Sequence, residues 1–342
     1  MKLHQLVRLA AAAAASLAII ASGADASAAR RSRSRAKAKA RTTAVKKSRR
    51  QPAASRYSSS RRSSSRSRSR GAKGVSVELP FSVGDRVYLA GTATGGQYVV
   101  YELLSDVAKS VQTISGGNGM VDGSFMASGE VFSVANTAYK ESRARVLWGT
   151  KEITDLTGPA TTNVAHAIWA YDDEIYIAGQ SGQNAVLWVN AKAQVLDDER
   201  SDALDVCYAN KQTYCCGYTV DASGAKHGRI WSSGGSVQLP ADGLVSVNAI
   251  LVDGSDVYIA GVEQSGASQQ AVAYTGRQRT VLKTDAGCVA VPGSIDVHGD
   301  NVYVAGMVTA ADGSSHPALW VNGEPQDISA LHLAAVKMMR AN

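Results

Sequence analysis

Apolar residues in most of the chain recur in short runs separated by Gly, Asp and Asn turns. The run "NVYVAG" (301–306) follows a Gly-Asp turn, and related phrases are "RVYLAG" (86–91), "EIYIAG" (174–179) and "DVYIAG" (256–261). In each phrase apolar side chains occupy both alternating sets of positions, so both faces of the predicted strand are apolar. This pattern is typical of a strand that is buried on both faces.

The aromatic residue of this phrase recurs at a nearly constant interval of 38 to 45 residues. It is found at Tyr88, Phe132, Tyr176, Tyr214, Tyr258 and Tyr303. A second aromatic landmark, usually Trp, follows each after 12–17 residues, and a third short apolar run comes after it. A further run precedes most of the phrases. Each period therefore predicts four short strands, which is the content of one β-propeller blade.

The six periods predict an all-β, six-bladed β-propeller of four-stranded blades over residues 75–342. Helical repeats are excluded because no 3.6-residue period runs long enough, and a β-helix would need shorter rungs. We expect the closing Ala-Gly of each phrase to fit where neighbouring blades crowd each other. The Trp or Tyr of the third strand should fill the wider outer part of the wedge between blades.

The ends of the repeat region suggest how the ring closes. "VSVELP" (75–80) aligns with "GSVQLP" (235–240) as an outer-strand segment, which leaves little room for an inner strand before Tyr88. The tail "LAAVKMMRAN" (333–342) resembles an inner strand with no blade behind it. We expect residues 331–342 to pair into blade one and close the ring, which removes exposed strand edges. Alternatively, "FSVG" (81–84) forms this inner strand and the tail is frayed.

The N-terminal part has a different composition from the repeats. Residues 1–28 combine Lys2 and Arg8, an apolar run and a small-residue cleavage pattern ending at Ala28, which predicts a secretory signal peptide. The apolar run is short and Ala-rich for a membrane anchor, and no second span follows. Residues 29–74 are rich in Arg, Ser and Lys with almost no large apolar residue, which predicts a disordered tether. We expect the protein to be exported to the periplasm, the cell surface or the medium.

Charge is strongly segregated along the chain. Residues 30–73 hold 18 Lys and Arg and no Asp or Glu, whereas residues 74–342 hold 16 Lys and Arg against 28 Asp and Glu, a net charge of −12. The basic arm predicts contact with a polyanion outside the cell, with candidate contacts at Arg61, Arg62, Arg66, Arg68 and Arg70. Alternatively, the arm folds back onto the acidic propeller or serves as a solvated spacer. Sequence-specific binding of nucleic acid is not expected, because no aromatic residues are interleaved with the charges.

The four cysteines are Cys207, Cys215, Cys216 and Cys288. Cys215 and Cys216 take the place of Ile-Ala in the repeat phrase, so they are interpreted as small packing residues. A disulfide remains open, because export permits one and Cys207 and Cys216 would lie diagonally on one face of a hairpin. The absence of a CxxC pair argues against a zinc or thioredoxin-like centre.

Sequence motifs for catalysis, metals and cofactors are absent. No HExxH, GxSxG, P-loop or dinucleotide-binding pattern occurs, so no catalytic residue, metal site or cofactor is predicted. The acidic group Asp197, Asp198, Glu199, Asp202 and Asp205 is interpreted as a solvated loop, with calcium binding as the alternative.

Trp169 differs from the other four tryptophans because it lies on a predicted inner strand. Phe125, Cys207, Leu251 and Asp296 occupy equivalent positions, and Lys337 is the candidate in the tail. Inner strands line a propeller channel, so Trp169, Asp296 and Lys337 are candidate residues for binding a small polar molecule. The alternative is that they are packing residues and a structural ion pair.

The phrases "DVYIAG" and "NVYVAG…ALWVNG" resemble the repeats of secreted bacterial β-propeller proteins, related in style to the kelch and NHL classes. The resemblance covers residues 75–342 and implies the fold. Neither the kelch double glycine nor the WD dipeptide is cleanly present, so no partner of those families is implied.

Together these features predict an exported, non-enzymatic and monomeric propeller that binds a protein or glycan, with an arm for anionic surface polymers. The alternative is a hydrolase or lyase that acts on glycans or metabolites at a channel site, an analogy at the level of fold.

Overall fold

In the computed structural model of the chain, the described residues are 87–341 apart from 94–96, 105–106, 115–119, 128–129, 140, 150, 173 and 236. The predicted signal peptide (1–28), the predicted tether (29–74) with its five candidate arginines, and residues 75–86 lie outside the described residues. In the described part, regular structure consists of strands and one short 3-10 helix, η2 (Ser329–Leu331).

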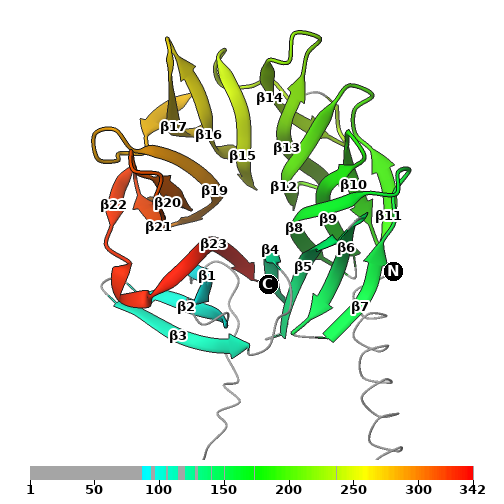
Figure 1. Ribbon diagram of the computed structural model, residues 1–342, viewed down its shortest axis with the longest axis horizontal. Coiled ribbons are helices and arrows are strands. Elements are labelled where there is room, and N and C mark those ends of the chain that lie inside the picture. The colour runs from blue at the N-terminus through cyan, green and yellow to red at the C-terminus, as the bar shows by residue number, and fades with distance from the viewer. Residues whose placement is uncertain are drawn as a thin grey trace, which may run out of the picture. The chain divides into compact units, whose positions relative to one another are not determined.

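The strands form six blades around a central axis (Figure 1). In blades two to six the chain enters at the inner strand and continues outward through antiparallel hairpins. Blades two and three contain β4 (Met120–Ala127), β5 (Glu130–Tyr139), β6 (Glu141–Trp148), β7 (Lys151–Leu156), and then β8 (Asn163–Tyr171), β9 (Glu174–Ser181), β10 (Asn184–Val189) and β11 (Lys192–Val195). Blades four to six contain β12 (Ser201–Ala209), β13 (Gln212–Val220), β14 (Lys226–Ser232), then β15 (Leu244–Asp253), β16 (Asp256–Ser265), β17 (Ser268–Thr275), β18 (Gln278–Val281), and then β19 (Val289–His298), β20 (Asn301–Thr309), β21 (Ser315–Val321) and β22 (Glu324–Gln326). The predicted all-β, six-bladed propeller is confirmed.

Blade one is assembled from two distant parts of the chain. It contains β1 (Val87–Ala93), β2 (Tyr98–Leu104) and β3 (Val107–Ile114), and its inner strand is β23 (Leu333–Ala341). β23 pairs antiparallel with β1, with Met339 opposite Tyr88. It also pairs in parallel with β4, with Arg340 opposite Phe125, so blades one and two share one eight-stranded sheet.

The second strand of a blade is buried on both faces because each face packs against a different neighbour. In β9, positions 175–179 are all buried. Ile177 belongs to a hydrophobic cluster with Phe125 of blade two, whereas Ala178 belongs to a cluster with Val206 of blade four. Burial of both faces by neighbouring blades is the reason that the repeat phrase lacks the polar alternation of a one-sided sheet.

The glycine of the repeat phrase is required within its own blade. A Cβ atom at Gly179 would lie 2.0 Å from the Val164 carbonyl oxygen, and one at Gly306 would lie 2.3 Å from the Val291 carbonyl oxygen. Both oxygens belong to inner strands that bulge at this level, where the register shifts by one residue. The expectation that the glycine relieves crowding between blades is therefore wrong, because the close atoms belong to the adjacent strand of the same blade.

Blade four departs from the predicted four strands. Its sheet contains three strands, ordered β12-β13-β14, and the described residues of the segment 235–240 are not in a strand. Val237 and Leu239 still pack against the cluster of blades four and five. The turn "SSGG" (232–235) is longer than the Asn-Ala turn of blade three, and Pro240 lacks the N–H that a strand pair needs.

Candidate functional site

The inner strands place one residue each at a common level of the channel, opposite the landmark aromatic of the second strand. These residues are Phe125, Trp169, Cys207, Leu251, Asp296 and Met339. Met339 therefore takes the position that the sequence interpretation gave to Lys337. Lys337 lies two residues earlier on β23, opposite Ala90.

Trp169 extends across the channel. Its ring centroid lies 5.6 Å from that of Phe125, and its side chain packs against hydrophobic clusters built by blades two to six. A side chain from blade three reaches residues of blades five and six only by crossing the axis. Trp169 thus packs as part of the core at this level.

One small polar cavity lies between the inner strands. Lys337, Asp205, Ser294 and His166 line a cavity of about 30 Å³, which is the volume of about one water molecule. The Lys337 Nζ atom donates a hydrogen bond of 3.0 Å to the His166 carbonyl oxygen. This cavity is too small for a sugar ring, and of the three candidate channel residues Lys337 lines it.

The channel carboxylates serve the backbone. Asp205 is buried, and its carboxylate accepts hydrogen bonds from Val206 N (2.8 Å) and from Ile250 N of the next blade (2.9 Å). Asp296 Oδ1 accepts a bond of 2.9 Å from Val297 N. These bonds hold the inner strands and join blades four and five.

His166 was not singled out from the sequence. It lies at the bulge of β8, and its Nε2 atom is 3.2 Å from the Asp202 Oδ1 atom on β12, so these two side chains meet where blades three and four adjoin. The sequence signal that could have identified His166 is the extra residue of the inner strand at this level. The bulge changes the direction of a side chain that would otherwise face a neighbouring blade.

The sequence predicts that the acidic residues between 197 and 205 form one solvated loop, but the structure places them in two different environments. Asp202 and Asp205 are buried on β12, whereas residues 197–199 precede it and their carbonyl oxygens accept bonds from Asn184 Nδ2. Across residues 87–341, leaving out the gaps, no three His, Cys, Asp or Glu side chains gather in a way that could hold a metal ion.

All four cysteines are free thiols, which answers the question left open by the sequence. Cys207 lies opposite Tyr214, and Cys216 lies opposite Asp205. Burial raises the pKa of the Cys215 thiol well above its ordinary value, and the nearby Cys207 and Asp205 add to this effect. The three cysteines of blade four are buried and act as packing residues.

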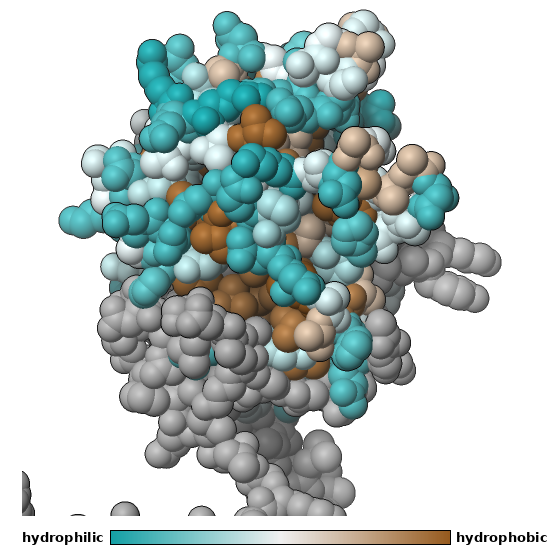
Figure 2. Space-filling view, turned by 90° about the vertical axis from the view of Figure 1, so that its left-hand side faces the viewer, coloured by the Kyte–Doolittle hydropathy of each residue, from teal (hydrophilic) through white to brown (hydrophobic). Residues whose placement is uncertain are grey.

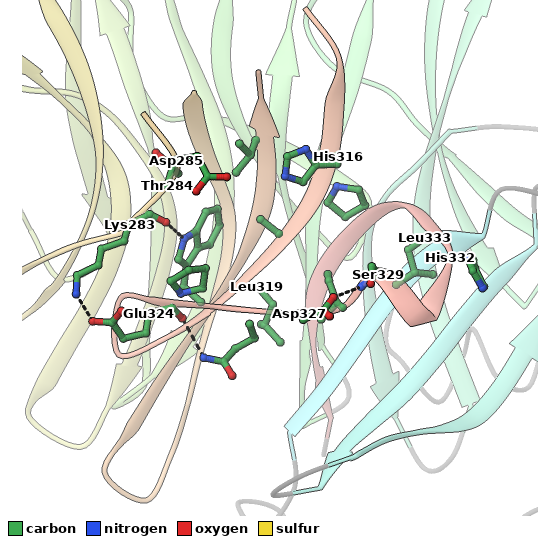
Figure 3. A pocket seen from close by; sticks show the side chains of 17 residues that line it. Lys283, Thr284, Asp285, His316, Leu319, Glu324, Asp327, Ser329, His332 and Leu333 are labelled. Carbon is green, nitrogen blue, oxygen red and sulfur yellow. Dashed lines mark hydrogen bonds and ion pairs between the residues drawn. The ribbon is translucent and has the colours of Figure 1, made fainter. Parts of the chain in front are cut away.

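The large cavities lie on the sides of the propeller. Cleft one, of about 630 Å³, is formed by the third strand of blade six (316–320), the exit of blade five (283–285) and the chain from β22 to the start of β23 (324–333). Figure 3 shows its mixed lining, with the Lys283–Glu324 ion pair at one edge and Leu319 and Leu333 among the apolar residues. On the side of the propeller that carries blades five and six, apolar residues reach the surface between polar ones (Figure 2).

Cleft two, of about 590 Å³, occupies the equivalent place on blade four. It is lined by the third strand (228–233), the exit of blade three (194–196) and residues of the segment 235–242. Trp231 in cleft two corresponds to Trp320 in cleft one. Because β14 has no strand on its outer side, cleft two also borders an open strand edge.

In the described ranges, no helix has the length and apolar character that crossing a membrane requires.

Comparison with known proteins gives likenesses in structure alone. No protein-family model matches the chain, and no curated protein matches it. Similar solved structures include TolB from Acinetobacter baumannii, with a TM-score of 0.43 and 11% identity over 76% of this chain and 67% of that chain. A putative TolB from Agrobacterium tumefaciens gives 0.40 and 12% identity over 71% and 87% of the two chains. The subtype N11 neuraminidase-like protein of A/flat-faced bat/Peru/033/2010 (H18N11) gives 0.40 and 12% over 68% and 80%.

Proposed function

We propose that the protein is an exported, non-enzymatic binding scaffold. In this proposal the propeller binds a protein or glycan at its lateral clefts, and the arm of residues 30–73 contacts anionic surface polymers. The observation that carries the proposal is the difference in cavity volume: the two lateral clefts have about 630 and 590 Å³, whereas the polar cavity between the inner strands has about 30 Å³. Ligand sites in proteins are clefts of some hundreds of cubic ångströms.

The packing of Trp169 and the bonds of Lys337 and Asp296 support a structural role for the three candidate channel residues. Lys337 Nζ and Asp296 Oδ1 form hydrogen bonds with the backbone, and the Trp169 indole packs against hydrophobic clusters of several blades. The alternative of a glycan- or metabolite-acting enzyme in the channel gains no support from this geometry.

The role of the arm is tested by chromatography on an anionic polysaccharide, with heparin as the probe. We expect the full chain to elute at higher salt than a chain that lacks residues 30–73, because a run of 18 cations releases bound counterions from the polymer. A full-length variant with every Lys and Arg of the arm replaced by Gln or Ser controls for arm length. Elution of all three chains at one salt concentration would exclude the arm as a polyanion-binding element.

The role of the clefts is tested with a glycan array and the full chain. Ala318, half-buried in cleft one, is replaced by Phe to fill the cleft, and Asp312→Asn serves as a surface control outside it. If the parent and the control bind a glycan that Ala318→Phe no longer binds, the glycan-binding site is assigned to cleft one. Binding that survives Ala318→Phe places the site elsewhere.

A further inference from the structure

The third strand of blade four, β14, has a free outer edge among the described residues (Figure 1). On its inner side it pairs with β13 without a bulge, and Ser233 N donates a hydrogen bond of 3.1 Å to the Thr213 carbonyl oxygen at the end of this ladder. This bond sets the phase of the ladder, so the odd-numbered residues of β14 bond to β13. The N–H and C=O groups that point away from β13 are those of Gly228, Ile230 and Ser232.

In the neighbouring blades, the equivalent outward groups bond to a fourth strand. The Ala185 carbonyl oxygen accepts a bond of 2.9 Å from Leu196 N in blade three, and the Ala271 carbonyl oxygen accepts one of 3.0 Å from Leu282 N in blade five. Gly228 takes the same place in blade four, three residues before the landmark aromatic. In the described part of blade four the corresponding bond is missing, and the segment that follows β14 is not in a strand.

The middle of this edge is buried and lines cleft two. Ile230 is 4% exposed. The repeat spacing places Val237 opposite Ile230, but within the described ranges no hydrogen bond joins them. Buried backbone N–H and C=O groups are almost always paired in native proteins, and leaving them unpaired is costly. The edge therefore favours a ligand that brings a backbone of its own, which is an extended peptide.

Arg229 adds a charge preference to this edge. Its side chain is 57% exposed at cleft two, and its Nε atom is 3.8 Å from Asp197 Oδ2, an oxygen that also accepts the 3.0 Å bond from the Trp231 indole. In blade two, the third-strand Arg145 forms an ion pair of 2.9 Å with Glu152 on the adjacent fourth strand. An acidic residue opposite Arg229 in an added strand would form a cross-strand pair of the same kind.

The apolar surface near the edge selects the residues on either side of the acidic one. In an added strand, the residue opposite Ile230 lies on the same face as Ile230, which belongs to the hydrophobic cluster of blades four and five. Val237 and Leu239 pack against that cluster without forming a strand. The preferred ligand therefore has β-branched apolar residues before and after the acidic residue.

We propose that cleft two is a strand-addition site, at which β14 binds an extended, antiparallel peptide with an apolar–acidic–apolar sequence. The peptide becomes the fourth strand of blade four and pairs with the outward backbone groups of Ile230. The inference rests on the proposed function, in which the lateral clefts bind ligands, and it specifies a peptide as the ligand of cleft two.

Isothermal titration calorimetry with the full chain tests the backbone pairing. The probe is the acetylated and amidated peptide Thr-Thr-Val-Glu-Val-Lys, which has no net charge and so is not drawn to the basic residues 30–73. In the proposed register its first Val lies opposite Ile230 and its Glu lies opposite Arg229. N-methylation of the first Val removes an N–H that points at β14 and should raise the Kd about tenfold. N-methylation of the Glu, whose N–H points away from β14, should change the Kd by less than about twofold. Equal effects of the two methyl groups, or no binding of the unmodified peptide, would overturn the proposal.

A double-mutant cycle tests the charge preference. Arg229→Gln in the protein and Gln for Glu in the peptide should each raise the Kd about threefold, and the second change should have no further effect on the first. Arg277→Gln is the matched control, because Arg277 is exposed in the turn between β17 and β18 and lies outside cleft two. If the peptide substitution weakens binding equally to the parent and to Arg229→Gln, the pairing with Arg229 is excluded.

Light scattering over a range of protein concentrations tests the other occupant of the edge, a second copy that pairs through β14. We expect a monomer at the concentrations used for calorimetry. A dimer that the peptide dissociates would assign the edge to self-association and overturn the proposal. Because no glycan or polymer is present in these assays, their failure would remove the peptide site at cleft two and leave the glycan and heparin results unchanged.

Discussion

The indole nitrogen of Trp320 donates a hydrogen bond of 2.8 Å to the carbonyl oxygen of Lys283, which lies where the chain leaves the preceding blade. Trp188 makes the same 2.8 Å bond to Thr157, and Trp231 donates a 3.0 Å bond to the Asp197 carboxylate. The recurring third-strand tryptophan therefore links each of these blades, by a hydrogen bond, to the segment that follows the last strand of the preceding blade.

Replacing Trp320 by Phe should destabilise the propeller. The change removes the donor and leaves the Lys283 carbonyl without this partner, which typically costs about 1–3 kcal/mol in addition to lost packing. Chemical denaturation of the parent and variant gives the difference directly. Trp188→Phe should give a similar loss, and an unchanged midpoint for both variants would contradict the fastening role.

The Gly179→Ala substitution tests the origin of the repeat glycine. The new Cβ would collide with the Val164 carbonyl oxygen, so we expect a loss of about 1–3 kcal/mol, the usual cost of overpacking. Gly293→Ala is the matched control, because its Cβ would lie 3.7 Å from the Ala305 oxygen, and it should shift stability by less than about 0.5 kcal/mol. Thermal melting of both variants decides between crowding within a blade and a general intolerance of alanine.

Removal of residues 331–342 should abolish the single cooperative melting transition. The deletion removes β23, which leaves the edges of β1 and β4 unpaired and favours aggregation. The milder Met339→Ala substitution, at a fully buried position, should cost about 2–5 kcal/mol without removing the strand. Melting curves combined with light scattering measure both effects; unchanged melting of the deletion would show that β23 is dispensable.

The free energy of unfolding of the propeller should decrease at low pH, in part because Glu263 becomes protonated. Burial by itself would raise the pKa of this carboxyl group, but hydrogen bonds from Arg279 and Tyr274 and the charge of Arg279 hold it below the ordinary 4.5. A depressed native pKa contributes stability that is fully present above pH 4.5 and is lost as pH falls below that value. Glu263→Gln should therefore flatten the acid limb of a stability–pH curve, and an identical limb in both proteins would exclude this contribution.

Thiol labelling of the folded protein should modify Cys288 alone. Cys288 is half-buried, whereas Cys207, Cys215 and Cys216 are buried, and burial raises the pKa of Cys215 so that little thiolate forms. Mass spectrometry should find one adduct on the native chain and four after denaturation. Fast labelling of the blade-four cysteines in the native state would show that this blade opens readily.

The repeat phrase predicted the blades because its chemistry is set by local neighbours that recur in every copy. Ile177 and Ala178 face different blades, and this is visible as two apolar faces in the sequence. The reason for Gly179 was not visible, because it depends on a bulge in the neighbouring strand β8. The missing strand of blade four depends likewise on a turn only slightly longer than that of blade three.

The channel could be predicted less well than the blades. The inner-strand position of Trp169 followed from the repeat, but its reach across the axis depends on packing against side chains of several blades that are distant in the sequence. Asp205 was read with its sequence neighbours as part of a loop, whereas β12 buries it so that it bonds to Ile250. The lateral clefts arise where three separate segments meet, which no single repeat encodes.

The position of β23 has a consequence for the order of assembly. Blades two to six are each continuous in sequence and can form as they are synthesised, while β1 waits for a partner that is made more than two hundred residues later. During that interval the edges of β1 and β4 are unpaired, so the risk of incorrect strand pairing is highest just before β23 closes the ring. Closure of the ring is therefore a single late event that depends on the pairing of β23 with β1 and β4.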